Sequence, residues 1–289
     1  MPRPLAVVTG AAGFIGARVV RALSIDHDVV GVGRGTARSS ITMAGLAGID
    51  RPASLVVHLA GGSSVGRSLE APLIDFEQTL PPLAQVLEWL RTSSPTARLV
   101  LASSGAVYGD GAGRPLAEDA PLHPASPYGH HRRLAESLCA SWAQTFQTAA
   151  VIVRLFSVYG PGQRKQLMWD ACCKAREGDR TFHGTGDEAR DWLHVDDAVA
   201  LLLAASRSAS PQVPIVNGGT GTATCVRAIV GAVFGALGAG EPTFSGATRA
   251  GDPALMMADV GRARALGWAP RVDVAAGVAE YVRWFGEQR

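Results

Sequence analysis

The sequence predicts an α/β fold in which a doubly wound parallel sheet is followed by a smaller C-terminal lobe, and three observations support this prediction. Short apolar runs alternate with helical patterns over residues 1–165, as in successive βαβ units. The runs are apolar throughout, which is typical of strands covered by helices on both faces. The alternation breaks after Gly160-Pro161-Gly162, so we expect the remaining chain to form a second lobe.

The predicted elements follow one another in a regular order. Strands are expected at residues 5–8, 28–32, 55–59, 98–102 and 151–155, and helices at residues 14–23, 72–91 and 128–145. Further helices are expected around residues 166–175 and at residues 195–205, separated by a Gly/Asp-rich loop at residues 184–188. The predicted domains are residues 1–165, to which residues 191–216 return, and residues 166–289.

One edge of the predicted sheet is short. Residues 33–54 are small, polar and rich in glycine, where a doubly wound sheet normally has another helix and strand. Either a stunted strand near residues 40–43 completes the sheet, or this edge is reduced.

Length and composition exclude several classes of protein. With 289 residues, 47% of them hydrophobic, the chain can bury a full α/β core in one large domain or two unequal lobes. A net charge of +2 with scattered basic residues gives no reason to expect nucleic acid as a partner. The four cysteines form no Cys-x-x-Cys pair, so we expect reduced thiols. Because we find neither a signal-peptide core nor a run long enough to cross a membrane, we expect a cytoplasmic protein without a membrane partner.

The segment TGAAGFIG at residues 9–16 lies between the first predicted strand and the first predicted helix. There Gly10 makes the tight turn, Gly13 lets the backbone approach a pyrophosphate, and Gly16 lets the helix pack closely on the sheet. The free amide groups and positive dipole end of the helix face the phosphates. In isolation the segment is an ordinary glycine-rich turn, but its context predicts a dinucleotide site in a sheet of the Rossmann type.

Candidate catalytic side chains follow the fourth strand. The segment SSGAVYG at residues 103–109 places hydroxyl groups at the carboxyl edge of the sheet, where open α/β sheets bind ligands. Tyr128 and Arg132 lie one turn apart at the start of the next helix. A phenol has a pKa of about 10, so acid/base work near neutrality requires a shift of roughly three units, about 4 kcal/mol. A nearby cation and a serine hydroxyl supply part of it; the alternative is a serine-rich strand end beside a structural tyrosine.

Segments distributed along the whole chain resemble the extended short-chain dehydrogenase/reductase family, which includes sugar-nucleotide epimerases, dehydratases and reductases. The segments are residues 9–16, HLAG at 58–61, residues 103–109, SPY at 126–128, RLFSVYGPG at 154–162, RDWLHVDD at 190–197, NGG at 217–219 and RAGDP at 249–253. The resemblance implies that Tyr128 is the acid/base and that Ser104 holds the substrate oxygen. The family's lysine, which binds nicotinamide ribose and lowers the phenol pKa, is replaced by Arg132, a larger, planar cation. We therefore expect either activity with altered nicotinamide geometry or impaired activity.

Cofactor choice depends on the end of the second strand. Residues 31–35, GVGRG, lack the carboxylate that binds the adenosine ribose of NAD, and Arg34 is placed to meet a 2′-phosphate, with Arg38 assisting. We therefore expect NADP(H), with NAD(H) as the alternative. The residues expected to bind the cofactor are Gly10, Gly13, Phe14, Ile15, Gly16, Arg34, Leu59, Ala60, Gly61, Tyr128 and Arg132.

The expected substrate is a nucleotide-diphosphate sugar. The resemblance assigns Arg190 and Arg249 to its diphosphate or nucleoside, which suits the arginine fork. The expected substrate-binding residues are Ser64, Ser104, Ser157, Arg190 and Arg249. No metal site is expected, and His58 and His194 are interpreted as supporting or packing residues. We expect His130, His131 and Arg133 to be solvated.

Three functions remain open: two reactions and one non-catalytic role. Gly105 and Ala106 stand where related dehydratases carry Asp-Glu, so elimination is disfavoured. The leading prediction is an NADPH-dependent 4-ketoreductase, and the alternative is a C4 epimerase with tightly held NAD. A third reading, motivated by Arg132, is a non-catalytic dinucleotide sensor. By the resemblance we expect a homodimer formed through the helices at residues 72–91 and 128–145.

Overall fold

A six-stranded parallel sheet forms the centre of the protein, in a computed structural model that describes residues 2–110, 113–247 and 253–288. The strands, in sheet order, are β2 (Asp28–Val32), β1 (Leu5–Thr9), β3 (Leu55–His58), β4 (Arg98–Ser104), β5 (Ala150–Leu155) and β9 (Ile215–Gly218). All neighbouring pairs run parallel. The α/β prediction is therefore confirmed.

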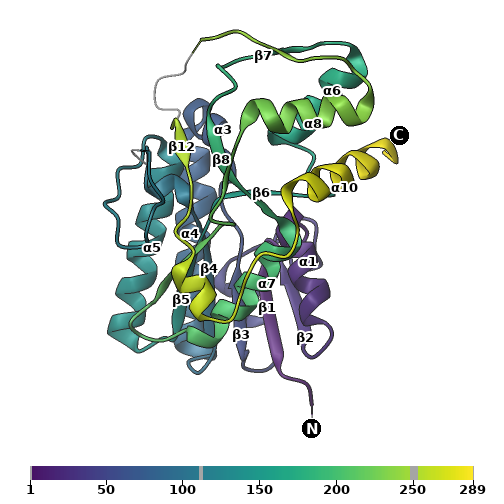
Figure 1. Cartoon of the computed structure of the whole chain (residues 1–289). Helices are drawn as coiled ribbons and strands as arrows, with labels where there is room; N and C mark the ends of the chain where they lie inside the picture. Colours follow the sequence, from purple (N-terminus) through teal and green to yellow (C-terminus); the bar gives the residue numbers. More distant parts are fainter. Residues whose placement is uncertain (1, 111–112, 248–252, 289) are drawn as a thin grey trace.

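Helices cover both faces of this sheet (Figure 1). Alternate residues of each strand point to opposite faces, so the side chains of the apolar strands pack in two separate cores, one on each face. On β1, Ala6 and Val8 pack in the core that includes α1 (Phe14–Leu23) and α7 (Val195–Ala205). Leu5 and Val7 pack in the other, with α2 (Met43–Ala47), α4 (Pro72–Ser93) and α5 (Pro127–Phe146).

The short edge of the sheet is reduced, as the second alternative predicted. Strand β2 is the outermost strand. Helix α2 begins at Met43, at the end of the segment 40–43 that the first alternative assigned to a stunted strand. Thr42 caps α2 by accepting a hydrogen bond from the Gly45 amide at 3.2 Å. Arg38 donates to the carbonyls of Gly45 and Gly48, at 3.3 and 2.6 Å. Because its guanidinium braces this loop, the expected assistance of Arg38 at a 2′-phosphate is not supported.

The chain returns to the sheet twice after residue 165. Helix α7 covers one face, and β9 pairs with β5. Residues 258–268, which the predicted division assigns to the second lobe, also return: Val260, Ala263 and Trp268 are buried in the same core as α1 and α7. The core packed on the main sheet therefore includes residues 258–268 in addition to residues from 1–165 and 191–216.

The remaining elements have a core of their own. It is built from α6 (Gln166–Glu177), α8 (Val226–Leu237) and α10 (Val274–Gly286). Small sheets join them: β6 (Ser157–Tyr159), β8 (Ala189–His194), β10 (Ala223–Cys225) and β12 (Leu255–Met256) in one, β7 (Thr181–Phe182) and β11 (Thr243–Phe244) in another. In Figure 1 helices α6, α8 and α10 lie above the main sheet, beyond the carboxyl ends of its strands. In the described part of the chain, no helix combines the length and apolar character needed to cross a membrane.

Candidate active site

A cleft of about 1300 Å³ lies at the carboxyl edge of the main sheet and is lined by residues from both parts of the protein. All but one of the candidate site residues line it. They are Gly10, Gly13, Phe14, Ile15, Gly16, Arg34, Leu59, Ala60, Gly61, Ser64, Ser104, Tyr128, Arg132, Ser157 and Arg190. The exception, Arg249, lies outside the described residues.

The glycine-rich turn after β1 has the geometry of a phosphate cradle. Gly10 has a φ of +68°, in the left-handed region that favours glycine. A Cβ atom on Gly16 would lie 2.1 Å from the Gly10 carbonyl oxygen, so α1 packs directly on the turn. Gly13 is the N-cap of α1 and has no side chain to bond its first amides. These amides and the positive dipole end fit a pyrophosphate.

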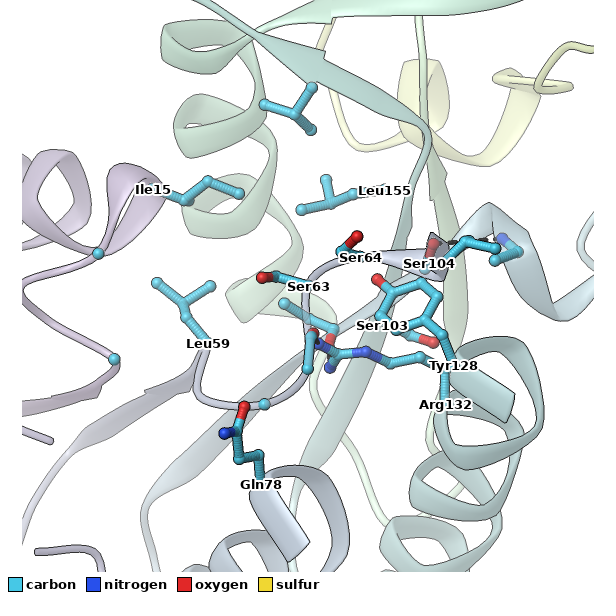
Figure 2. A pocket seen from close by; sticks show the side chains of 18 of the residues that line it. Ile15, Leu59, Ser63, Ser64, Gln78, Ser103, Ser104, Tyr128, Arg132 and Leu155 are labelled. Atoms are coloured by element: carbon cyan, nitrogen blue, oxygen red, sulfur yellow. Dashed lines mark hydrogen bonds between the residues drawn. The ribbon is translucent and has the colours of Figure 1, made fainter. Parts of the chain in front are cut away.

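Ser104 and Tyr128 meet at the end of β4. The Ser104 hydroxyl accepts a hydrogen bond from the Ala106 amide at 3.2 Å, which starts the short 3₁₀ turn η1 (Gly105–Val107). Ser126 caps α5 by accepting from the Gly129 amide at 3.2 Å, and this places Tyr128 in the first turn. In Figure 2 the Tyr128 hydroxyl points into the cleft, on the side of Ser64 and Ser104.

Arg132 lies beside the Tyr128 ring and is only 7% exposed. Its Cζ is 5.3 Å from the ring centroid. Nη1 donates to the Ala102 carbonyl at 3.0 Å, and Nη2 donates to the Gly62 carbonyl. Nε has no hydrogen-bond partner among the described residues. The backbone therefore fixes a full positive charge beside the phenol, and two of the five guanidinium N–H donors are already used.

Gly62 is itself held in place by α4 and α5. The Gly62 amide donates to Thr79 Oγ1 at 3.0 Å, and the Asp75 carboxylate packs so closely on Gly62 that a Cβ there would lie 1.8 Å from Oδ1. Asp75 Oδ2 lies 2.7 Å from His131 Nδ1, and both side chains are largely buried. The prediction that His131 is solvated is therefore wrong, whereas His130 and Arg133 are exposed as expected.

His58, at the end of β3, is buried behind the site. Thr9 Oγ1 accepts from the amides of Leu59 and Ala60 and lies 2.9 Å from His58 Nδ1. These two amides use both acceptor positions of the hydroxyl, so Thr9 donates its one proton to Nδ1, which is then the unprotonated ring nitrogen. Burial, assisted by the positive charge of Arg132, lowers the pKa of His58 to about 3. The ring is a neutral packing residue, and the described residues include no cluster of three or more side chains suited to a metal.

A buried ion pair beneath Ser104 was missed in the sequence. Arg154 Nη2 lies 2.7 Å from Glu136 Oε2, and Ser103 Oγ donates to Glu136 Oε1 at 2.5 Å. Arg154 also donates to Tyr108 Oη at 2.8 Å. The network joins β4, α5 and β5 and so fixes the strand end that carries Ser104. Its signal in the sequence is an arginine inside an otherwise apolar strand.

Arg34 and Arg190 lie at different walls of the cleft. Arg34 is exposed beyond the end of β2, and no ion-pair or hydrogen-bond partner for its side chain is found among the described residues. Arg190, on β8, donates from Nη1 to the carbonyls of Ala189 and Pro253, at 3.0 and 2.7 Å. A further cation that lines the cleft, Lys165, was not predicted from the sequence although lysine is rare in this chain.

Comparison with known proteins identifies the family. The model of the NAD dependent epimerase/dehydratase family matches residues 6–219. The chain belongs to this family. The UDP-glucose 4-epimerase of Mycolicibacterium smegmatis is 31% identical over 96% of this chain and 97% of its own length. The dTDP-glucose 4,6-dehydratase of Streptomyces griseus is 31% identical over 98% of this chain and 94% of its own. The predicted family resemblance is therefore confirmed.

Solved structures of this epimerase/dehydratase family agree with the fold over its whole length. MoeE5 in complex with UDP-glucuronic acid and NAD superposes with a TM-score of 0.87 and 28% identity, over 98% of this chain and 99% of that chain. The bound dinucleotide there is NAD, so a preference for NADP(H) is not supported. The similarity to a UDP-glucose 4-epimerase likewise favours the epimerase alternative over the leading 4-ketoreductase prediction.

Proposed function

We propose that this chain is an epimerase that inverts a hydroxyl-bearing carbon, C4, of a nucleotide-diphosphate sugar with NAD as cofactor. The observation that carries the proposal is that Tyr128 and Ser104 line the cleft together with Gly105 and Ala106. Elimination needs an additional acid and an additional base, and the side chains of Gly105 and Ala106 supply neither. The family's epimerase members, to which this chain is similar over nearly its full length, support the same choice.

The proton chemistry of the proposed reaction belongs to residues of this chain. Tyr128, as phenolate, takes the hydroxyl proton of the sugar while Ser104 donates a hydrogen bond to the same oxygen. Arg132 stabilises the phenolate through its fixed positive charge beside the ring. NAD, held by the phosphate cradle before α1, would supply a hydride acceptor for this carbon and would return the same hydride, so the reaction would be redox-neutral. Tyr128 gives its proton back to the oxygen in the second half-reaction.

Epimerisation requires the oxidised sugar to present its other face before the hydride returns. A site that permits this turn needs room and few directional contacts around the ring. Several residues that line the cleft have small side chains, among them Ser63, Ser64, Ala106 and Ser157. Arg190 is the proposed holder of the diphosphate, so the sugar can turn while the nucleotide stays bound. The phosphate cradle before α1 is the proposed site of the NAD pyrophosphate.

The test is to incubate the protein with NAD and with UDP-glucose, UDP-N-acetylglucosamine or UDP-glucuronate. Inversion at C4, seen by NMR without net production of NADH, is the expected result. Stoichiometric consumption of NADPH with a keto-sugar nucleotide would instead establish the reductase. Replacing Tyr128 with Phe should lower turnover about 10²–10⁴-fold with little change in NAD affinity. Normal turnover in this variant would refute the assigned role of Tyr128.

A further inference from the structure

The cleft contains one lysine whose role the proposed mechanism does not use. The chain has only two lysines among its 27 Lys and Arg residues, Lys165 and Lys174. Lys165 stands at the N-cap of α6, and its side chain extends across the cleft to the loop between β3 and α3 (Val65–Glu70). Its Nζ donates to Ser63 Oγ at 2.6 Å, and the neighbouring Gln166 Nε2 donates to the Ser63 carbonyl at 3.4 Å. The second lobe is thus joined to the loop that holds Arg132.

The charge of Lys165 is not neutralised by this contact. An ammonium group has three donors, and Ser63 takes one of them. In residues 2–110, 113–247 and 253–288, no carboxylate lies within ion-pair distance of Lys165 or of Arg67 on α3. Partial burial, together with the positive charge of Arg67, lowers the pKa of Lys165. A cation in the lining of a cleft, with no carboxylate beside it, favours an anionic ligand.

The position of Ser63 indicates which end of the ligand this anion belongs to. Ser63 follows Gly62, whose carbonyl holds Arg132, and Figure 2 shows Ser63 and Ser64 on the same side of the cleft as the Tyr128 hydroxyl. Tyr128 marks the reacting carbon in the proposed function. Arg190 approaches from a different element, β8. The lysine therefore faces the part of the substrate next to the sugar.

We propose that Lys165, positioned by Ser63, forms a subsite for an anionic oxygen group of the substrate at its sugar end. Two groups of a nucleotide sugar have this chemistry: the β-phosphate, and a carboxylate carried by the sugar itself. The proposal deepens the proposed function and rests on it for the identity of the ligand. The ammonium is a compact point charge, which suits either group.

Binding of UMP, UDP, UDP-glucose and UDP-glucuronate to the wild type and to Lys165→Gln tests the subsite. If the contact is to the β-phosphate, the variant should lose about tenfold or more in affinity for every ligand except UMP. If it is to a sugar carboxylate, only UDP-glucuronate should lose affinity. Lys165→Arg should restore most of the binding. Lys174→Gln is the matched control, because Lys174 lies on the same helix and donates to the Thr181 carbonyl.

Because the chain has only two lysines, chemical modification of lysine provides a second test of the subsite. A lysine-acylating reagent, followed by peptide mass analysis, should modify Lys165 less when UDP-glucuronate, which carries both candidate groups, is bound and should modify Lys174 equally. Affinities that do not change in Lys165→Gln, or that fall equally in Lys174→Gln, would overturn the subsite. If the wild type binds no nucleotide sugar, the proposed function fails. In that case inorganic pyrophosphate becomes the probe. If it lowers the acylation of Lys165, the anion site is supported without the proposed function; if it does not, the anion site is refuted as well.

Discussion

The guanidinium of Arg132 lies with its Cζ 5.3 Å from the centre of the Tyr128 ring and is bonded to two backbone carbonyls, those of Ala102 and Gly62. The two donors come from the two ends of one planar fork. A lysine ammonium is a single point charge on a flexible stem and cannot reproduce this pair of contacts with the same geometry. The arginine is therefore built into this site by the strand and loop around it.

Arg132→Lys should consequently impair the protein. We expect turnover to fall by tenfold or more and the free energy of unfolding to fall by roughly 1–3 kcal/mol, because a buried carbonyl loses its donor. Steady-state kinetics and denaturant unfolding measure the two effects separately. Equal or higher turnover in Arg132→Lys would show that arginine is merely tolerated in the family's lysine position.

Arg34 should affect NADP and not NAD. Its exposed guanidinium lines the cleft beyond β2, where residues 31–35 include no carboxylate to oppose a 2′-phosphate. One charge-assisted contact contributes about 1.5–3 kcal/mol, so Arg34→Ala should weaken NADP about ten- to hundredfold. The affinity for NAD should stay the same. Titration of both dinucleotides into the wild type and the variant measures the four affinities. Equal NADP affinities of the two proteins would show that Arg34 does not contact the 2′-phosphate.

Local patterns in the sequence were sufficient for the main sheet and for the position of part of the cleft at its carboxyl edge. Strand ends in a parallel sheet meet at one edge, so Ser104, Tyr128 and the glycine turn could be brought together from their order alone. Contacts between distant elements could not be predicted in this way. The Asp75–His131 pair joins two helices, and the Lys165–Ser63 contact joins two lobes. The partner of each of these residues depends on how distant elements pack, and the spacing of residues along the chain does not indicate this.

Arg190 should be required for binding of the nucleotide diphosphate. Because its Nη1 also holds the Pro253 carbonyl, Arg190→Ala removes a structural contact as well, and binding must be separated from stability. We expect UDP affinity to fall by roughly 1.5–3 kcal/mol while NAD affinity is unchanged. Isothermal titration with UDP and with NAD, together with a thermal unfolding curve, measures all three. Loss of NAD binding in parallel would indicate local unfolding rather than a lost phosphate contact.

His58 should make the protein less stable in mild acid. Its pKa is 6.5 in an ordinary environment and about 3 in the folded protein, so between these values the unfolded chain binds a proton that the folded chain does not. Stability therefore rises with pH in this window: the contribution of His58 is fully present above pH 6.5 and is lost as the pH falls toward 3. From pH 7 to pH 5 the loss is about 2 kcal/mol.

His58→Asn separates this effect from other titrations. The asparagine oxygen can accept the Thr9 hydroxyl in place of Nδ1, and the side chain carries no titrating proton. The variant should be less stable than the wild type at pH 7 because it fills less of the buried space, but the difference should shrink by about 2 kcal/mol at pH 5. Denaturant unfolding of both proteins at several pH values measures this difference. Two parallel curves would mean that His58 is protonated in the folded protein as readily as in the unfolded chain, and the assignment of a neutral ring behind the site would be wrong.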